Sequence, residues 1–442
     1  MSEIRSTLAF IAILFSVAAT VLESMAVSVA LPAISADFDV SASGATWVIA
    51  ISQFVIVALL LPMAALGEVV GYRRVFLTSL SVFCISTLAC FLAPSFSVLV
   101  VARAVQAVGT AGAMSLGFAM ARLVFPDGRI GTAVGIIAAT VAISSSIGPA
   151  VAGLILVAFD WRGVFALMLV FSLFAVIFGA LTLPPNQPSN KPYDYPGAAL
   201  VAFVLAALLW WINGLANGWP GATLFPAALI AVVGMVLIVR RSRGKPSPVF
   251  PVDLLARPTF ALSIAASICA FVAQSIGFIL LPFYLIFGAG MNALEMALTL
   301  SVWPAATAVL APVLGRFSDR ISAGPAGAAG LLIMAAGFLW LAFLDKDSSA
   351  VEIAVRFAVC GVGFALFQTP NNRLIILSAP RERSGAASGS LSLARQIGRA
   401  IGTAIAAYVL ATGTPSTSLE AMMIGAILAV LGAILSFARR KI

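Results

Sequence analysis

The sequence predicts an all-α integral membrane protein, and three observations support this fold class. Hydrophobic residues make up 62% of the 442-residue chain and charged residues 9%, which is more apolar surface than a soluble domain of this length can bury. Fourteen apolar stretches, each close to the twenty or so residues that cross a bilayer, follow one another with short connections. The alternating pattern of barrel strands is missing, so backbone groups in lipid must be satisfied within helices.

Taken in order, these stretches predict helices at residues 7–30, 44–66, 75–93, 96–122, 131–158, 163–183, 197–216, 221–240, 258–284, 293–317, 325–344, 350–375, 384–411 and 418–438. The first is too long for a signal peptide, although Ser16-Val17-Ala18 resembles a cleavage site, so we expect it to remain as a span. A proline-rich linker, 184–188, follows the sixth helix, and the turn 217–220 separates the seventh from the eighth.

The distribution of basic residues predicts how the chain lies in the membrane. With the N-terminus placed in the cytoplasm, the inner loops hold nearly all arginines and lysines outside the spans, whereas the outer loops hold only Arg162 and Lys346. This asymmetry follows the positive-inside rule and places both termini in the cytoplasm. The formal charge of +9 is therefore interpreted as a topology signal, and nucleic acid is not an expected partner.

The chain also contains an internal repeat. The segment 64–74 after the second helix is echoed by Gly315–Arg320 after the tenth, and Arg103 in the fourth helix is echoed by Arg356 in the twelfth. In each case the second feature lies roughly 250 residues after the first. Two parallel halves repeated about an axis along the membrane normal are typical of secondary transporters. Helices seven and eight then form an inserted pair.

Four motifs in this order resemble one transporter family. They are Leu22–Pro32 in the first helix, the loop segment 64–74, Arg103–Gly109 in the fourth helix, and Gly148–Gly153 in the fifth, with Trp161-Arg162 just beyond. Together they are similar to the fourteen-helix drug:proton antiporter family of the major facilitator superfamily. The chain departs from that pattern where Glu23 and Glu68 replace the usual aspartates.

The resemblance implies a major facilitator fold of two parallel six-helix bundles plus an inserted two-helix hairpin, with fourteen transmembrane helices. The expected domains are the N-terminal bundle (1–183), the linker, hairpin and cytoplasmic loop (184–257), and the C-terminal bundle (258–442). It further implies a proton-coupled exporter of drugs, dyes or biocides that works by alternating access. We expect a monomer in a bacterial inner membrane, in contact with lipids, protons and a small-molecule substrate, without a cofactor or metal.

Glu23 and Arg103 are the candidates for proton coupling. Each lies inside an apolar helix, where an ionised side chain costs several kcal/mol unless it is paired or, for a carboxylate, protonated. The chain has no histidine, so carboxylates must carry any coupled proton. A purely structural role for the two residues, as a vestibule cap or a bridge to backbone carbonyls, remained open at this level.

The expected substrate path is mostly apolar, with aromatic and adaptable polar groups. The candidates that share this chemistry are Gln53, Gln106, Gln274, Tyr284, Trp303, Phe367, Gln368 and Asn371. A second set is expected to latch, bend or closely pack the halves as they move, and it comprises Glu68, Gly71, Arg73, Arg74, Gly148, Pro149, Gly153, Asp319 and Arg320. Ordinary lipid-facing aromatics and solvated loop charges are the competing interpretation.

Two further arginines, Arg395 and Arg399, lie one turn apart in the thirteenth helix. They favour an alternative in which the protein exports one metabolite, lipid or organic anion on the same fold. An embedded enzyme is disfavoured, because a chain without histidine lacks the usual dyads and metal clusters. No Walker-type phosphate loop occurs in the sequence, so ATP is not an expected energy source.

Overall fold

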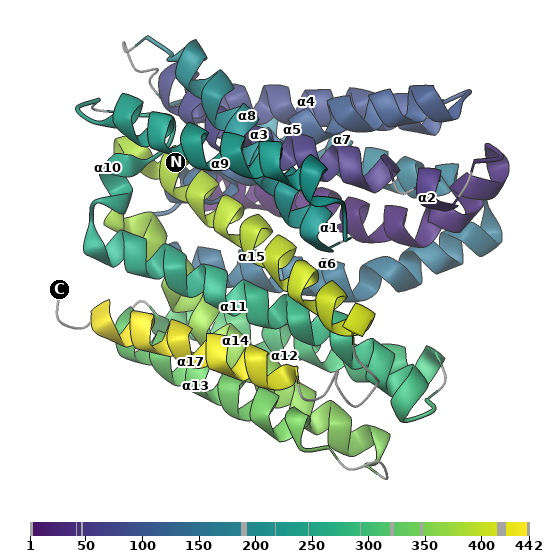
Figure 1. The fold of residues 1–442 in the computed structure, drawn as a ribbon. Coiled ribbons are helices and arrows are strands. Elements are labelled where there is room, and N and C mark those ends of the chain that lie inside the picture. Colours follow the sequence, from purple (N-terminus) through teal and green to yellow (C-terminus); the bar gives the residue numbers. More distant parts are fainter. Residues whose placement is uncertain are drawn as a thin grey trace.

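The computed structural model describes residues 3–40, 42–45, 47–186, 192–216, 218–245, 247–291, 293–318, 322–344, 348–412 and 421–439, which fold as helices joined by short connections (Figure 1). The elements are α1 (Glu3–Asp37), α2 (Ala42–Ala45), α3 (Trp47–Val70), α4 (Tyr72–Phe91), α5 (Phe96–Val124), η1 (Asp127–Arg129), α6 (Ile130–Ala158), α7 (Arg162–Thr182), α8 (Tyr195–Ala216), α9 (Gly221–Ser242), α10 (Val252–Leu255), α11 (Pro258–Phe283), η2 (Tyr284–Gly288), α12 (Ala293–Ser318), α13 (Ala323–Ala342), α14 (Ala350–Ser378), η3 (Arg381–Arg383), α15 (Ser384–Thr412) and α17 (Met422–Ala438).

Twelve helices in the described part of the chain are long and apolar enough to cross a membrane. The sequence predicted fourteen. The two that differ are α15, which has 29 residues but carries Arg395, Arg399 and several serines, and α17, which is apolar but has 17 residues. Both positions are helical, so the difference concerns polarity and length. A count of fourteen spans therefore stays a prediction.

Local sequence explains where several helices begin. Ser95 caps α5 by accepting a hydrogen bond from the Val98 backbone N–H, and Ser349 caps α14 in the same way through Glu352. The chain turns between α3 and α4 at Gly71, whose φ of 110° favours glycine. The matching caps on α5 and α14 agree with the repeat, because these helices are its expected counterparts.

The same five helix pairs pack together in the two parts of the molecule. Before the linker, α1 packs on α6 and α7, α5 on α3 and α4, and α4 on α7. After α10, α11 packs on α15 and α17, α14 on α12 and α13, and α13 on α17. Each pair in the first set has its counterpart in the second when the helices are matched in order. We call the first set the N half and the second the C half.

Glycines permit the closest crossing inside each half. A Cβ atom at Gly109 of α5 would lie 2.6 Å from the Phe83 backbone nitrogen of α4, and one at Gly363 of α14 would lie 2.4 Å from the Met334 nitrogen of α13. Neither contact leaves room for a side chain. The paired helices therefore approach through small residues, as is common in membrane bundles.

The two halves meet along two seams. One is formed by α6 and α12, and the other by α3 and α5 with α15, which runs diagonally across the middle of Figure 1. At the first seam, a Cβ atom on Gly135 would lie 2.4 Å from the Ala311 carbonyl oxygen, and one on Gly315 would lie 2.7 Å from the Gly131 oxygen. At Gly153 of α6 nothing lies within 4 Å of an added Cβ atom, so close packing there as the halves move stays a prediction.

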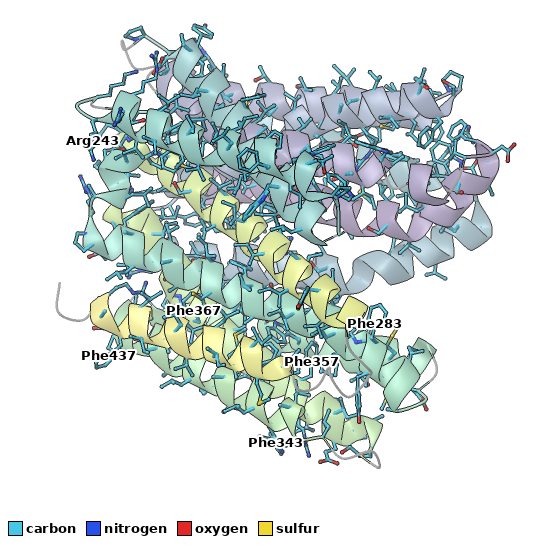
Figure 2. All side chains as sticks on the ribbon, in the orientation of Figure 1. Arg243, Phe283, Phe343, Phe357, Phe367 and Phe437 are labelled. Atoms are coloured by element: carbon cyan, nitrogen blue, oxygen red, sulfur yellow. The ribbon has the colours of Figure 1, made fainter. Side chains whose placement is uncertain are left out.

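The helices α8 and α9 pack on each other, and α8 also contacts α3 and α15. Trp210 of α8 packs its ring on Phe54 of α3, with centroids 5.6 Å apart. The outer surface is apolar, with side chains such as Phe343 and Phe437 projecting away from the core (Figure 2). A broad exposed apolar surface of this kind fits a lipid environment.

Candidate functional site

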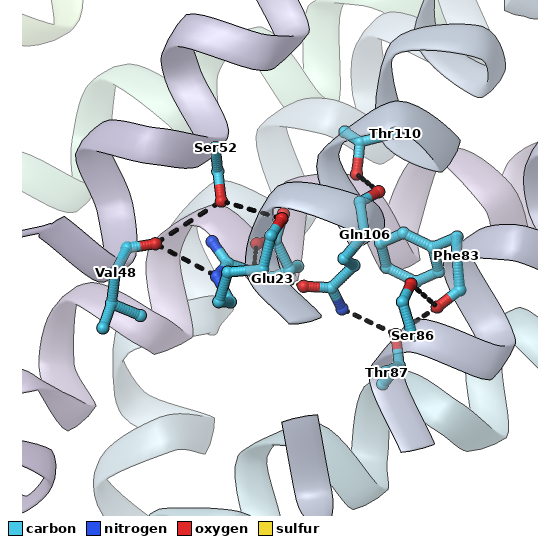
Figure 3. Close-up of polar contacts among 9 residues, drawn as sticks. Glu23, Val48, Ser52, Phe83, Ser86, Thr87, Gln106 and Thr110 are labelled. Atoms are coloured by element: carbon cyan, nitrogen blue, oxygen red, sulfur yellow. Dashed lines mark hydrogen bonds and ion pairs between the residues drawn. The ribbon is translucent and has the colours of Figure 1, made fainter. Parts of the chain in front are cut away.

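Glu23 and Arg103 meet inside the N half (Figure 3). Arg103 of α5 donates through Nη1 to the Glu23 carboxylate of α1, and the two side chains are 3% and 2% exposed. The same Nη1 donates to the side-chain oxygen of Gln106, and Nε donates to the Val48 carbonyl oxygen of α3 at 3.1 Å. Arg103 therefore joins three helices through one side chain.

Two hydroxyl groups extend this network. The Gln106 amide nitrogen donates to Oγ1 of Thr87 on α4 at 2.6 Å, and the Ser52 hydroxyl reaches the Arg103 carbonyl oxygen at 3.5 Å. Because Arg103 has acceptors at Gln106 and Val48 besides Glu23, it keeps hydrogen-bond partners if the carboxylate is neutralised. The geometry thus permits the Glu23 carboxylate to be neutralised while the Arg103 guanidinium keeps its hydrogen bonds to Gln106 and Val48.

A second ion cluster joins the two halves at one end of the molecule. Arg383, in η3 of the C half, donates to the Glu68 carboxylate at the end of α3, and their side chains are 5% and 6% exposed. Arg383 also makes a two-pronged contact with Asp253, at 2.9 and 2.8 Å, and donates to the Pro248 carbonyl oxygen at 3.0 Å. Ala386 donates its backbone N–H to Glu68 at 2.7 Å. We call Glu68, Asp253 and Arg383 the latch.

Neighbouring contacts close the same end. The Tyr72 hydroxyl donates to the Glu382 carbonyl oxygen at 3.0 Å and accepts from the Gly385 N–H at 3.1 Å. From the N half, Arg122 donates to the Ile376 and Ala379 carbonyl oxygens at 2.7 and 2.8 Å. These bonds satisfy carbonyl groups at the end of α14, so the halves are held together by backbone as well as charge.

The other residues expected to act with Glu68 are Arg73, Arg74, Asp319 and Arg320. Arg73 donates to the Ala180 carbonyl oxygen at 2.6 Å, within the N half, and its backbone N–H reaches the Asn186 side chain. Arg74 is exposed. Asp319 and Arg320 lie outside the described residues. In this conformation Arg73 contacts the N half and the linker, and its expected part in holding the halves together stays a prediction.

The pair Gly148-Pro149, where the sequence predicts a helix that can bend and pack closely, lies within α6. The helix α6 continues as one α-helix from Ile130 to Ala158 through both positions. Its close contact with the C half comes at Gly131 and Gly135 instead. Whether the Gly148-Pro149 pair moves during transport stays a prediction.

The residues expected on the substrate path fall into three groups. Gln53 of α3 is exposed and Gln274 of α11 is half-buried. Gln106 belongs to the Arg103 network. The third group lies buried in the C half and comprises Tyr284, Trp303, Phe367, Gln368 and Asn371. Gln106 lies in the N half and the third group in the C half, and the role of these eight residues on one substrate path stays a prediction.

Asn371 has a structural partner that the sequence did not reveal. Its side-chain oxygen accepts from Arg439 at 2.5 Å, and its amide nitrogen donates to the Ser267 hydroxyl at 2.8 Å. Arg439 also donates to the Ser263 hydroxyl at 2.7 Å and to Ser436. In this conformation the Asn371 side chain is occupied in joining α14 to α11 and α17.

Sequence reasoning missed Arg383, Asp253, Tyr72 and Arg122. For Arg383 a signal was available, because the repeat relates it to Arg129: each ends a three-residue turn that opens a long helix, η1 before α6 and η3 before α15. Asp253 lies in the short helix α10, before the first long helix of the C half, and nothing in its local sequence indicates that it faces Arg383.

An apolar groove of about 550 Å³ lies between α4 and α5. Its lining includes Val82, Ile85, Val101 and Val105, of which Ile85, Val101 and Val105 are among the exposed apolar residues of the outer surface. The groove is lined by one half only and holds no part of the Arg103 network or the latch. It is suited to apolar lipid chains and does not define the transport path.

Comparison with known proteins identifies the family. A model of the Major Facilitator Superfamily matches residues 13–403. The chain belongs to this superfamily of transporters. A solved structure of the human organic anion transporter TETRAN has the same fold, with a TM-score of 0.71, 16% identity and coverage of 99% of this chain and 100% of that one. The protein is therefore a multi-pass membrane protein and a member of a transporter family.

Three bacterial relatives are similar over most of the length. An uncharacterized transporter of Escherichia coli, YebQ, is 39% identical over 431 residues, 97% of this chain and 94% of its own. The multidrug resistance protein Stp of Mycobacterium tuberculosis is 31% identical over 401 residues, 90% of this chain and 74% of its own. The riboflavin transporter RibZ of Clostridioides difficile is 28% identical over 379 residues, 85% of this chain and 82% of its own.

Proposed function

We propose that this protein is a proton-coupled exporter of amphipathic small molecules that works by alternating access. The observation that carries the proposal is the buried pair of Glu23 and Arg103, a titratable carboxylate and a permanent cation inside one bundle. Similarity to the multidrug resistance protein Stp supports export of such compounds. Protonation of Glu23 would weaken its attraction to Arg103, while Gln106 and Val48 keep the cation hydrogen-bonded.

The helix α3 offers a physical link between proton binding and the latch. Its first turns hold Val48 and Ser52, which contact Arg103, and its other end holds Glu68, which pairs with Arg383. Ser52 and Glu68 lie about 24 Å apart along the helix, at 1.5 Å per residue. We infer that proton arrival at Glu23 weakens the tie between α1 and Arg103, and that the resulting shift of Arg103, still bonded to Val48 of α3, favours opening at the latch.

Topology follows from the basic residues. We propose that both termini and the latch face the cytoplasm of a bacterial cell, so that the described conformation is closed on the cytoplasmic side. Fourteen spans in a monomer, divided at 183 and 258 with α8 and α9 as an inserted hairpin, complete this proposal. Repetition of the five helix pairs in each half supports it.

The test replaces Glu23 by glutamine, which has nearly the same shape but cannot ionise. Inside-out vesicles carrying either form are energised with a proton gradient, and uphill uptake of ethidium, rhodamine 6G and fluorescein is measured. Glu23→Gln should abolish gradient-driven uptake while surface expression and passive exchange remain. Uphill transport at the wild-type rate would rule out Glu23 as the proton carrier.

A second candidate is a dedicated exporter of one metabolite, lipid or organic anion. Arg395 and Arg399 favour it, as does similarity to the riboflavin transporter RibZ. Growth protection against dyes, quaternary ammonium biocides and organic anions separates the two. Protection against many cations supports the multidrug exporter, whereas protection limited to one anionic class supports the dedicated one.

A further inference from the structure

The helix α15 carries two arginines without counterions in the centre of the molecule. Arg395 is 8% exposed, and its Nε has no hydrogen-bond partner among the described residues. Arg399, four residues later and therefore on the same side of the helix, is exposed. Within the described chain neither forms an ion pair. The Arg395 guanidinium lies over the ring of Phe271, 5.4 Å from its centroid.

This arrangement is energetically incomplete. A cation in a membrane interior costs several kcal/mol unless an anion, water or acceptor groups compensate it. Stacking on an aromatic ring returns about 0.5 to 2 kcal/mol. By contrast, Arg103, Arg356 and Arg383 each contact a carboxylate. Arg395 and Arg399 differ from these three buried arginines, since no acid among the described residues pairs with them.

The two arginines belong to a polar stripe on α15. Ser388, Ser392, Arg395 and Arg399 follow one another at spacings of three or four residues, so they share one face of the helix. The Ser392 hydroxyl donates to the Met114 carbonyl oxygen of α5 at 3.0 Å, which shows that this face is turned toward the N half. The stripe therefore lies at the seam between the two halves.

Other buried polar atoms without a hydrogen-bond partner lie on α15 and on α14, which α15 contacts. Of the eight buried side-chain polar atoms that lack a partner in the described chain, four are Thr369 Oγ1, Asn372 Nδ2, Ser388 Oγ and Arg395 Nε, from the contacting helices α14 and α15. Each of the four can donate a hydrogen bond. Buried polar groups are normally paired, so each of these four atoms is available to donate to an acceptor from outside the described chain.

We propose that the Arg395–Arg399 face of α15 binds a negatively charged group, such as a carboxylate, sulfonate or phosphate, of the transported amphiphile. Phe271 holds the Arg395 guanidinium in place, and Arg399 provides the accessible charge at which an anion first arrives. The inference rests on the proposed function as a transporter and gives its substrate class. An anionic lipid headgroup has the same chemistry, and the experiment separates the two sources.

The test measures binding without any proton gradient. Purified protein in nanodiscs of neutral lipid is titrated with fluorescein, an anionic xanthene dye, and with rhodamine 6G, a cationic dye on the same skeleton. Cholate and dodecyl phosphate serve as further anions. Affinity is measured by equilibrium binding and by the shift in melting temperature, for wild type, Arg395→Gln, Arg399→Gln and Arg395→Lys. The matched control is Arg243→Gln, at an exposed arginine at the end of α9 (Figure 2).

At least one of the three anions should bind the wild type, and Arg395→Gln and Arg399→Gln should each weaken it tenfold or more. Arg395→Lys should lose less, Arg243→Gln nothing, and rhodamine 6G should not bind more weakly to the glutamine variants. Without ligand, Arg395→Gln should melt no lower than wild type, because it removes an uncompensated buried charge. A lower melting temperature would show a structural role for Arg395.

Three results would overturn the proposal: no binding of any anion, binding that the arginine substitutions leave unchanged, or stabilisation by phosphatidylglycerol alone, which would indicate a lipid site. Because no gradient is present, arginine-dependent binding without proton-driven export would contradict the proposed coupling and leave the anion site standing. Proton-driven export of rhodamine 6G with no anion binding would contradict the anion site and leave the proposed coupling standing.

Discussion

Replacing Arg383 by glutamine should shift the protein toward the conformation that is open at the latch. Arg383 is the only cation that contacts Glu68 or Asp253 among the described residues. Although burial opposes its charge, the two carboxylates hold the pKa of Arg383 above its ordinary value, so it stays protonated. Glutamine cannot supply this charge or reach all three acceptors at once.

The size of the effect follows from the burial of the two acids. Breaking a buried ion pair by removing one partner costs about 3 to 5 kcal/mol. The lower end applies, because the Ala386 N–H still donates to Glu68. Asp253, with 27% of its side chain exposed, adds at most about 1 kcal/mol. Since the latch joins different halves, the cost of roughly 3 kcal/mol falls on the closed form, a shift of more than about 100-fold in the equilibrium.

Cysteine labelling measures this shift. In a background without the four native cysteines, Ser388→Cys places a thiol at a fully buried position on the α15 face that meets the N half. A maleimide reagent should react with it slowly in the closed form. Adding Arg383→Gln should raise the labelling rate by about two orders of magnitude, following the population of the open form.

The matched control is Arg381→Gln, the same change at an exposed arginine two residues earlier, which should leave the rate within about twofold of the parent. An Arg383→Gln protein that labels as slowly as the control would refute the reasoning, since the latch would then contribute nothing to closure. Equal labelling of both variants at a high rate would point to local unfolding of η3.

Three further predictions concern packing, pH and the α8–α9 pair. Gly135→Val should lower the melting temperature by several degrees or prevent folding, because its Cβ would lie 2.4 Å from the Ala311 carbonyl oxygen. Gly153→Val in the same helix should not, because nothing lies within 4 Å of that position. An equal loss of stability in both variants would contradict the α6–α12 crossing. Burial acts to raise the pKa of Asp194, but hydrogen bonds from Arg241 and Lys245 hold that pKa well below its usual range. The ionised carboxylate should therefore add about 0.5 to 1 kcal/mol to the free energy of unfolding above the ordinary aspartate pKa near 4, and this contribution should fade as the pH falls. Asp194→Asn should lose the contribution and lower the melting temperature at pH 7, and a wild-type melting temperature at pH 7 would contradict the pairing. Trp210→Ala should leave transport within about twofold of wild type, because α8 lies beside the halves; loss of transport would place this ring on the substrate path.

Much of the fold could be predicted from the sequence, because membrane helices are defined by long apolar runs and the repeat is visible as ordered motifs. The alignment of Arg103 with Arg356 anticipated that α5 and α14 would be counterparts, and the recurring helix pairs agree with it. Span counting differed at α15, where Arg395, Arg399 and several serines lower the hydropathy that identifies a span.

The sites were predictable only in part. Glu23 and Arg103 stand out because charge is rare in apolar helices, but their contact depends on helix packing that sequence does not state. The latch was half found: Glu68 lies in a recognisable motif, whereas Arg383 and Asp253 reach it from segments more than 180 residues away in the chain. Aromatic residues such as Trp303 gave no indication of whether they face a path or the core, since both environments favour them.

Proton movement measured directly in proteoliposomes tests the central claim. Purified protein is reconstituted with a pH-sensitive dye in the lumen, and an outward gradient of an exported compound is imposed with no initial pH difference. The wild type should move protons against the direction of the compound, while Glu23→Gln should still exchange labelled compound and move no protons. Proton flux in Glu23→Gln equal to that of the wild type would contradict the assignment of Glu23 and Arg103 as the coupling pair.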